Sequence, residues 1–204
     1  MKFSSKNSYL VINGKKAELT KEQLKALGIV KDKVYLSDFG KIANIGDYEF
    51  IVIKTDDKFG IVQLLLKDSL EDMRFGDTND FRNSDIKNRL NKFAEEISDI
   101  IGEENLVEHN VDLTADDGLK CYGAVKSKMS LFTANMAREN VEILDEFKLN
   151  KWWWLVTPWS TSKHDENICV TCVSPRGLIR NNNAFFSNYG VRPFCIVKSS
   201  IFES

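Results

Sequence analysis

The sequence predicts an α+β fold in which β-strands surround two central helices and a β-rich segment ends the chain. Three observations support this prediction. Apolar runs of strand length occur at 34–37, 48–54 and 61–66, and turn-forming residues separate them. Between Ser84 and Gly102 the apolar residues instead follow helical spacing. After residue 151, aromatic and β-branched runs alternate with Pro and Gly, which is typical of short strands and turns.

The first thirty residues predict a separate small module. Tyr9–Ile12 is a β-rich run, Asn13-Gly14 is a strong hairpin-turn dipeptide, and Ala17–Leu19 is a candidate return strand. Thr20–Gln23 matches a helix capping box, and Gly28 is a suitable helix end. We therefore divide the chain into a hairpin-helix module at 1–30 and a main domain at 31–204.

The main domain is predicted to hold two helices, each with a recognisable N-cap. Ser84 caps the first, which carries Ile86, Leu90, Phe93, Ile97, Ile100 and Ile101. Thr133 caps the second, which carries Met136, Val141, Leu144 and Phe147. The other predicted elements are strands near 106–111, 128–133, 152–156, 168–173, 177–179 and 191–198, turns at 115–118 and 174–177, and a polar loop beginning at 181–183. Pro193 lacks a backbone donor, so we expect it at a bulge or an edge.

Composition excludes several classes of protein. The 204 residues are 43% hydrophobic and 28% charged, which is ordinary for a globular domain. A net charge of -2 lacks the basic excess that extended nucleic-acid binding requires. We find no signal-peptide core and no apolar run long enough to span a membrane, so we expect a soluble cytoplasmic protein. The 4 cysteines are then expected to be reduced thiols.

Several motifs occur in an order that is specific to one family. They are Asn83–Asn91, Val111–Gly118, Met129–Thr133, Trp153–Pro158, Val173–Gly177 and Gly190–Pro193. Residues 44–198 thereby resemble a family of unknown function, common in gut-bacterial genomes and their phages, with a WWLRSP…DG…GVRP signature. Here the signature arginine is Val156, and the DG turn is Pro175-Arg176-Gly177.

The resemblance implies a C-type-lectin-like domain. Members of that family resemble the branch of the fold that includes formylglycine-generating enzymes and the variable proteins of diversity-generating retroelements. Residues 11–28 resemble a leader found on phage accessory proteins. A phage or prophage origin is therefore implied.

Four tryptophans are the most prominent candidates for binding. On a strand, Trp153 should oppose Trp152 and Trp154, so we expect one of these faces in the core and the other exposed. Trp159 follows Pro158 in a loop and is the better candidate for an exposed position. Exposed aromatic rings stack well on a sugar, a base or a side chain of a partner.

The stretch from Arg180 to Tyr189 combines Asn side chains with aromatic rings, as antibody paratopes do. In the related retroelement variable proteins, the corresponding region carries the ligand-binding residues. The alternative is a solvated loop with Phe185 or Phe186 turned inward. Arg192 is a possible ligand contact, although a structural bond to a carboxylate or to carbonyls is favoured. The candidate ligand-binding residues are Trp152, Trp154, Trp159, Arg176, Asn181, Asn182, Asn183, Phe185, Tyr189 and Arg192.

No motif predicts catalysis or metal binding. Cys169–Cys172 is a lone CxxC in a predicted strand, so we interpret it as small core thiols. The resemblance raises the possibility of a copper-binding cysteine pair, for which Cys172 and Cys195 are the conceivable choice. The acidic residues at 112–117 are explained by a turn without calcium. We therefore predict no catalytic residue, metal or cofactor.

The leading hypothesis is a non-catalytic phage or prophage protein that binds a bacterial host protein or a surface glycan. One version acts in the host cytoplasm, for instance on a defence component, and another is a virion-associated receptor-binding protein. A structural virion protein and a copper- or thiol-dependent oxidase are the alternatives. The oligomeric state does not follow from the sequence.

Overall fold

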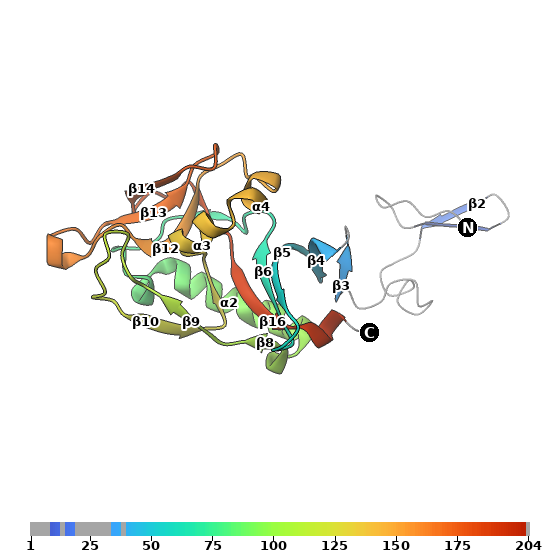
Figure 1. Cartoon of the computed structure of the whole chain (residues 1–204). Coiled ribbons are helices and arrows are strands. Elements are labelled where there is room, and N and C mark those ends of the chain that lie inside the picture. Colours follow the sequence, from blue (N-terminus) through green and yellow to red (C-terminus); the bar gives the residue numbers. More distant parts are fainter. Residues whose placement is uncertain (1–8, 13–14, 19–33, 38–39, 203–204) are drawn as a thin grey trace.

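The computed structural model describes residues 9–12, 15–18, 34–37 and 40–202 (Figure 1). These residues form a mixed α and β structure in which β-sheets predominate. Strands β1 (Tyr9–Ile12) and β2 (Lys15–Glu18) pair antiparallel, as predicted, with the return strand beginning two residues early. The predicted Asn13-Gly14 turn lies outside the described residues. The helix predicted at 20–28 lies outside the described residues, and the division at residue 30 remains a prediction.

The larger sheet has seven strands and joins both ends of the main domain. Its order is β11 (Met129–Ser130), β16 (Phe194–Lys198), β6 (Ile61–Leu66), β5 (Tyr48–Asp56), β4 (Ile42–Ile45) and β3 (Val34–Ser37), and β8 (Leu106–Val107) also pairs with β16. The predicted strands at 34–37 and 61–66 have the predicted bounds. The last strand begins at Phe194 rather than at Val191, so Pro193 precedes it.

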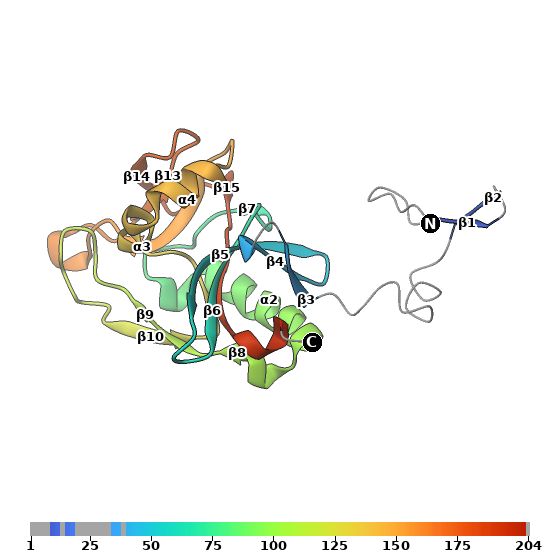
Figure 2. The same ribbon diagram turned by 45° about the vertical axis from the view of Figure 1, so that its right-hand side comes forward.

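Helix α2 (Asp85–Ile101) has both of its predicted caps. The Ser84 hydroxyl accepts a hydrogen bond from the Lys87 backbone N–H at 3.0 Å, and Gly102 ends the helix at φ 87. Its apolar stripe is buried against β4, β5 and β6, where Phe93 contacts Tyr48 edge-on with ring centroids 4.8 Å apart. In both views α2 runs between the sheet that contains β13 (Cys169–Val173) and β14 (Ile179–Asn183) and the hairpin of β9 (His109–Asp112) and β10 (Ala124–Ser127) (Figure 2). None of the helices in the described ranges is long and apolar enough to cross a bilayer.

The smaller sheet has five strands. Its order is β14 (Ile179–Asn183), β13 (Cys169–Val173), β12 (Trp153–Pro158), β15 (Tyr189–Gly190) and β7 (Asp72–Met73), with β12 and β15 parallel. The prediction of a loop at Asn181–Asn183 is wrong, because these residues pair with Cys169–Thr171 across the β13–β14 hairpin. Polar composition indicated a loop, but an edge strand tolerates polar residues as well.

The remaining elements are short. They are the hairpin of β9 (His109–Asp112) and β10 (Ala124–Ser127), the helices α3 (Ala134–Glu139) and α4 (Val141–Glu146), and the 3₁₀ helices η2 (Phe81–Asn83), η3 (Glu103–Asn105), η4 (Ser162–His164) and η5 (Ser199–Phe202). A single helix was predicted after Thr133. Instead the helix breaks at Asn140, whose side chain donates to the Met136 carbonyl at 2.8 Å.

Strand β12 is buried on both faces. Trp154 and Val156 belong to the hydrophobic cluster around α2, whereas Trp153 and Leu155 belong to a second cluster beneath α3. The expectation that one face of this strand would be exposed is therefore wrong at Trp153 and Trp154. Two separate clusters cover the strand, so alternation alone did not determine which residues reach solvent.

Candidate functional site

The three consecutive asparagines of β14 do not share one face of the strand. Antiparallel partners lie on the same face, and Asn181 and Asn183 are paired with Thr171 and Cys169, whereas Asn182 is paired with Val170 in the core cluster. The side chain of Asn182 donates to the Tyr189 hydroxyl at 2.5 Å. Asn182 therefore has a structural partner, and Asn181 and Asn183 lie on the opposite face.

Tyr189 and Trp154 are core residues rather than ligand contacts. Their relative exposures are 4% and 0%, and their rings stack with centroids 4.3 Å apart. The Trp154 indole N–H donates to the Met73 carbonyl at 3.0 Å, so its polar atom is also satisfied. Trp152 is half-buried beside Tyr189 at 5.6 Å. The predictions of ligand contact at Trp154 and Tyr189 are wrong, because their rings fill the core.

Arg192 is also structural, and its prediction as a ligand contact is wrong. It is 1% exposed and donates to the carbonyls of Leu66, Lys67 and Phe147 at 2.8, 2.9 and 3.0 Å. Its guanidinium lies 5.1 Å from the centroid of the Trp153 ring. Burial lowers the pKa of Arg192 to about 10, which still leaves it charged at neutral pH. The favoured alternative, bonding to carbonyls, is the one found.

Trp159 is exposed at the end of β12. Its backbone N–H donates to the Cys169 carbonyl at 2.9 Å, which places Trp159 on the same face as Asn183 and Asn181. The Phe185 backbone N–H donates to the Asn183 side chain at 3.0 Å, which holds the segment after β14 against the end of that strand. Trp159 is 40% exposed, and Phe185 and Phe186 are each 49% exposed. Neither phenylalanine is turned inward as the alternative interpretation required.

Phe186 lies beside Tyr189, with ring centroids 6.5 Å apart, on the Asn182 side of the strand. We call the remaining group the terminal aromatic surface: Trp159, Asn181, Asn183 and Phe185. Arg176 does not belong to it. Although exposed, Arg176 lies in the Ser174–Gly177 turn, which the Gly177 N–H closes onto the Ser174 carbonyl at 2.8 Å. That turn is at the end of the β13–β14 hairpin opposite Asn183. The predicted binding residues therefore divide among the core, this turn and the terminal aromatic surface.

A buried asparagine that sequence reasoning missed supports the Trp159 loop. Asn79 is 0% exposed, and its amide donates to the carbonyls of Ser160 and Cys169 at 3.1 and 2.9 Å. Its oxygen accepts from the Tyr122 hydroxyl at 2.8 Å. A fully satisfied buried network of this kind rigidifies the backbone around it. Nothing in the local pattern around Asn79 predicts these bonds, because all of its partners are distant in sequence.

The comparisons with known proteins bear on the second half of the chain. Residues 106–199 match the family model described as Domain of unknown function (DUF6273). The DUF6273 segment covers just under half of the chain, and it contains the whole terminal aromatic surface. The match agrees with the expected resemblance to a family of unknown function. No curated protein and no solved structure matches the chain.

The carboxylates at 112–117 in the DUF6273 segment are engaged in internal bonds. Asp117 accepts from the Ser160 hydroxyl at 2.5 Å and lies 3.1 Å from the His164 ring, and the Ser160 bond is the main influence that lowers the pKa of Asp117. Asp112 accepts from Thr114, and Asp116 pairs with Arg138 at 2.6 Å. Within the described ranges, no cluster of three or more His, Cys, Asp or Glu residues is placed to hold a metal ion.

The cysteines do not form a reactive pair in this arrangement. Cys172 lies in β13 and Cys195 in β16, and burial raises the pKa of both thiols to about 12. Both therefore stay protonated, which disfavours metal ligation and nucleophilic attack. Cys169 and Cys172 are three residues apart on one strand, so their side chains point to opposite faces. This geometry does not suit a single ion held by both thiols of the CxxC.

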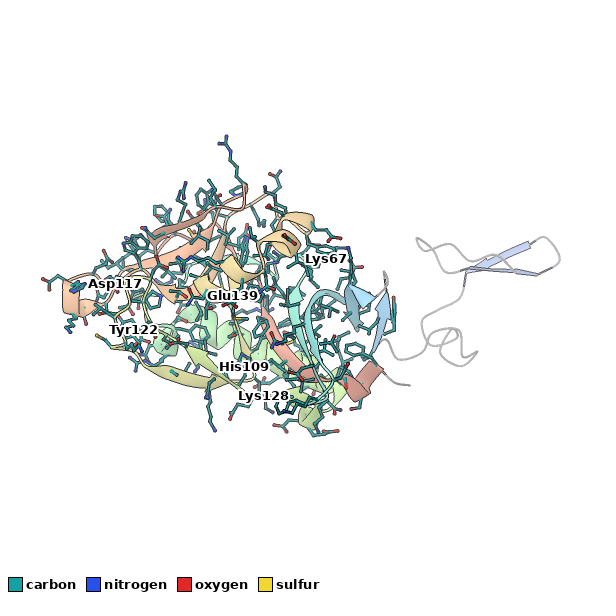
Figure 3. All side chains as sticks on the ribbon, in the orientation of Figure 1. Lys67, His109, Asp117, Tyr122, Lys128 and Glu139 are labelled. Atoms are coloured by element: carbon teal, nitrogen blue, oxygen red, sulfur yellow. The ribbon has the colours of Figure 1, made fainter. Side chains whose placement is uncertain are left out.

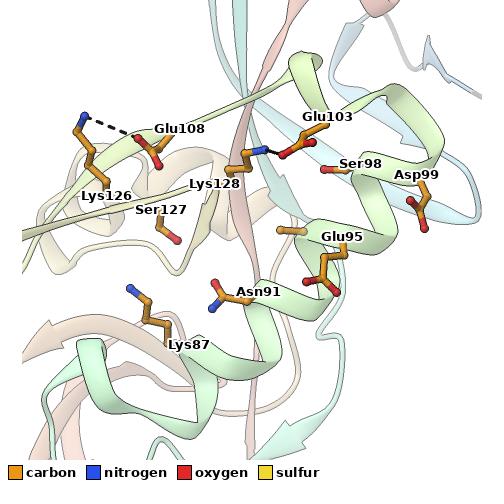
Figure 4. Close-up of a pocket in the computed structure, with 11 residues that line it drawn as sticks. Lys87, Asn91, Glu95, Ser98, Asp99, Glu103, Glu108, Lys126, Ser127 and Lys128 are labelled. Atoms are coloured by element: carbon orange, nitrogen blue, oxygen red, sulfur yellow. Dashed lines mark hydrogen bonds and ion pairs between the residues drawn. The ribbon is translucent and has the colours of Figure 1, made fainter.

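A polar groove of about 700 Å³ lies between α2 and the β8–β10 region (Figure 4). Lys87, Asn91 and Glu95, spaced four residues apart on α2, form one wall. On the other wall Lys128 pairs with Glu103 at 2.8 Å, and Lys126 with Glu108 at 3.7 Å. Charges of both signs line the groove, and the lysines of this wall pair with carboxylates on the same wall. The groove therefore does not select ligands of one charge.

Proposed function

We propose that this chain is a non-catalytic binding protein that recognises a protein ligand through the terminal aromatic surface. The observation that supports this most directly is the exposure of Trp159 on a backbone that the Asn79 network holds in place. Tryptophan is among the residue types enriched at the energetic centres of interfaces. An exposed aromatic group on a rigid support loses little conformational entropy on binding.

The amides beside the aromatic rings fit the same role. Asn181 is exposed and makes no side-chain hydrogen bond within the described part of the chain. Asn183 accepts one bond from Phe185 and is half-buried. A surface of aromatic rings with adjacent amides combines apolar contact area with adaptable hydrogen bonding, as paratopes do.

A protein ligand is favoured over a glycan. The exposed Phe185 ring adds apolar area without hydroxyl or carboxylate groups to bind sugar hydroxyls. The carboxylates at 112–117, the group first considered for calcium, are already hydrogen-bonded or paired within the chain. The calcium-assisted route to sugar binding is thus unsupported at that segment.

The proposal extends to the fold family and the setting. We assign the main domain to the C-type-lectin-like fold and the chain to a phage or prophage, on the order of the motifs from Asn83 to Pro193. The DUF6273 match supports the resemblance to a family of unknown function. The ligand would then be a bacterial protein in the host cytoplasm.

The test compares variants of the aromatic surface with a matched control. Trp159→Ala and Phe185→Ala should each abolish recovery of the partner from a bacterial lysate, as measured by quantitative mass spectrometry. Phe59→Ala removes a 69% exposed ring on the β5–β6 turn of the other sheet and should leave recovery unchanged. Equal recovery by all three variants, or binding of a glycan array that Trp159→Ala abolishes, would overturn the proposed protein ligand.

A further inference from the structure

A second cavity of about 340 Å³ lies between β9, α3 and the β16–β6 part of the larger sheet. Its walls are mainly apolar and come from separate elements: Val111, Leu131, Met136, Phe194 and Ile196. Volumes of roughly 300–1,000 Å³ with apolar walls and a few polar groups are typical of small-molecule sites. No residue of the terminal aromatic surface lines it, so this site does not depend on the proposed function.

His109, which is labelled in Figure 3, and Ser130 line this cavity and supply hydrogen-bonding groups. The His109 Nε2 and the Ser130 hydroxyl are 3.1 Å apart, and Ser130 is 2% exposed. The imidazole also packs edge-on against Phe194, with ring centroids 5.4 Å apart. Its Nδ1 is buried, and among the described residues no hydrogen bond of normal geometry reaches it. The ring is thereby fixed in orientation while its polar atoms are incompletely satisfied.

Burial favours the neutral form of the His109 imidazole. Burial is the main influence on His109 and lowers its pKa, and the Val107 carbonyl acts in the opposite direction with a smaller effect. A neutral imidazole carries one donor and one acceptor, and the serine hydroxyl carries both. Because Asp112 is the charged side chain that lines the cavity, the site disfavours an anion.

We infer that this cavity binds a small, neutral, single-ring molecule bearing a hydroxyl group. The ring would contact Met136, Ile196 and Phe194, and the hydroxyl would bond to the His109–Ser130 pair. A ring without a hydroxyl would gain the apolar contacts alone. Each hydrogen bond of this kind contributes about 1 kcal/mol, which corresponds to roughly a fivefold difference in affinity.

The test uses phenol as the probe and benzene as its matched control, with methionine methyl groups observed by NMR. Met136 lines the cavity, whereas Met73 lies in β7 of the other sheet and serves as the internal reference. Phenol should shift the Met136 methyl signal saturably with little effect on Met73, and it should bind several-fold more tightly than benzene. Ser130→Ala should reduce the affinity for phenol to that for benzene.

Further variants guard against a folding defect. His109→Phe and the milder His109→Gln should both remove the preference for phenol, whereas His164→Phe changes an exposed ring elsewhere and should keep it. The site is refuted if phenol shifts Met73 as much as Met136. It is also refuted if phenol and benzene bind equally to the native chain, or if the preference survives in a folded His109 or Ser130 variant.

Discussion

The two ends of strand β12 use tryptophan in opposite ways. At one end Trp153 and Trp154 are buried at 2% and 0% exposure, each in a different hydrophobic cluster. At the other end Trp159 is 40% exposed, and its loop is tied down through backbone carbonyls. The same contrast recurs for arginine and histidine. The identity of a side chain therefore says little about its role here, and its position relative to the two clusters decides it.

The contrast between tryptophans predicts the largest effect on stability. Trp154→Ala should lower the free energy of unfolding by about 3–5 kcal/mol, because it leaves a cavity beside Tyr189 and Phe75. Trp159→Ala should change it by less than about 0.5 kcal/mol, as is usual for an exposed position. Urea denaturation followed by circular dichroism measures both values. Similar losses in the two variants would show that Trp159 is a core residue instead.

The contrast between arginines predicts a slightly smaller effect. Arg192→Met should lower the free energy of unfolding by about 3 kcal/mol, because it leaves the carbonyls of Leu66, Lys67 and Phe147 without their buried donor. Arg176→Met changes an exposed turn residue and should be neutral within about 0.5 kcal/mol. The same denaturation experiment tests the pair. If the Arg192→Met variant were as stable as the native chain, the hydrogen bonds from the guanidinium to these carbonyls would not stabilise the fold.

The contrast between histidines predicts the smallest effect, a dependence of stability on pH. Burial lowers the pKa of His109 in the folded state below its ordinary value of about 6.5. The unfolded chain therefore binds more protons on acidification. The contribution of His109 to the free energy of unfolding is fully present above pH 6.5. It declines as the pH falls through 6.5 toward the folded-state pKa.

Unfolding measured at pH 7.5 and pH 5.5 tests this dependence. His109→Phe should lose less stability between the two values than the native chain. Equal losses in the two proteins would show that other groups cause the decline.

The sequence predicted the local features well where local interactions determine them. The start and end of α2 followed from Ser84 and Gly102, and the turn at Ser174–Gly177 followed from its Pro and Gly. The full extent of strand β14 was not predicted, because the polar residues Asn181–Asn183 are typical of a loop. Only their pairing with β13 in the folded chain shows that they form a strand. The network at Asn79 and the cavity at His109 were also missed. Both bring together residues that are distant in the chain, and no local pattern records such contacts.

The sequence alone determined the α+β composition and the caps of α2, because those depend on interactions within a few residues. Only the tertiary structure decided which tryptophan, arginine and histidine reach solvent. The physical reason is that β12 lies between two clusters assembled from elements far apart in the chain. Burial on both of its faces removed Trp153 and Trp154 from the surface, so that Trp159 is the exposed indole at the end of this strand.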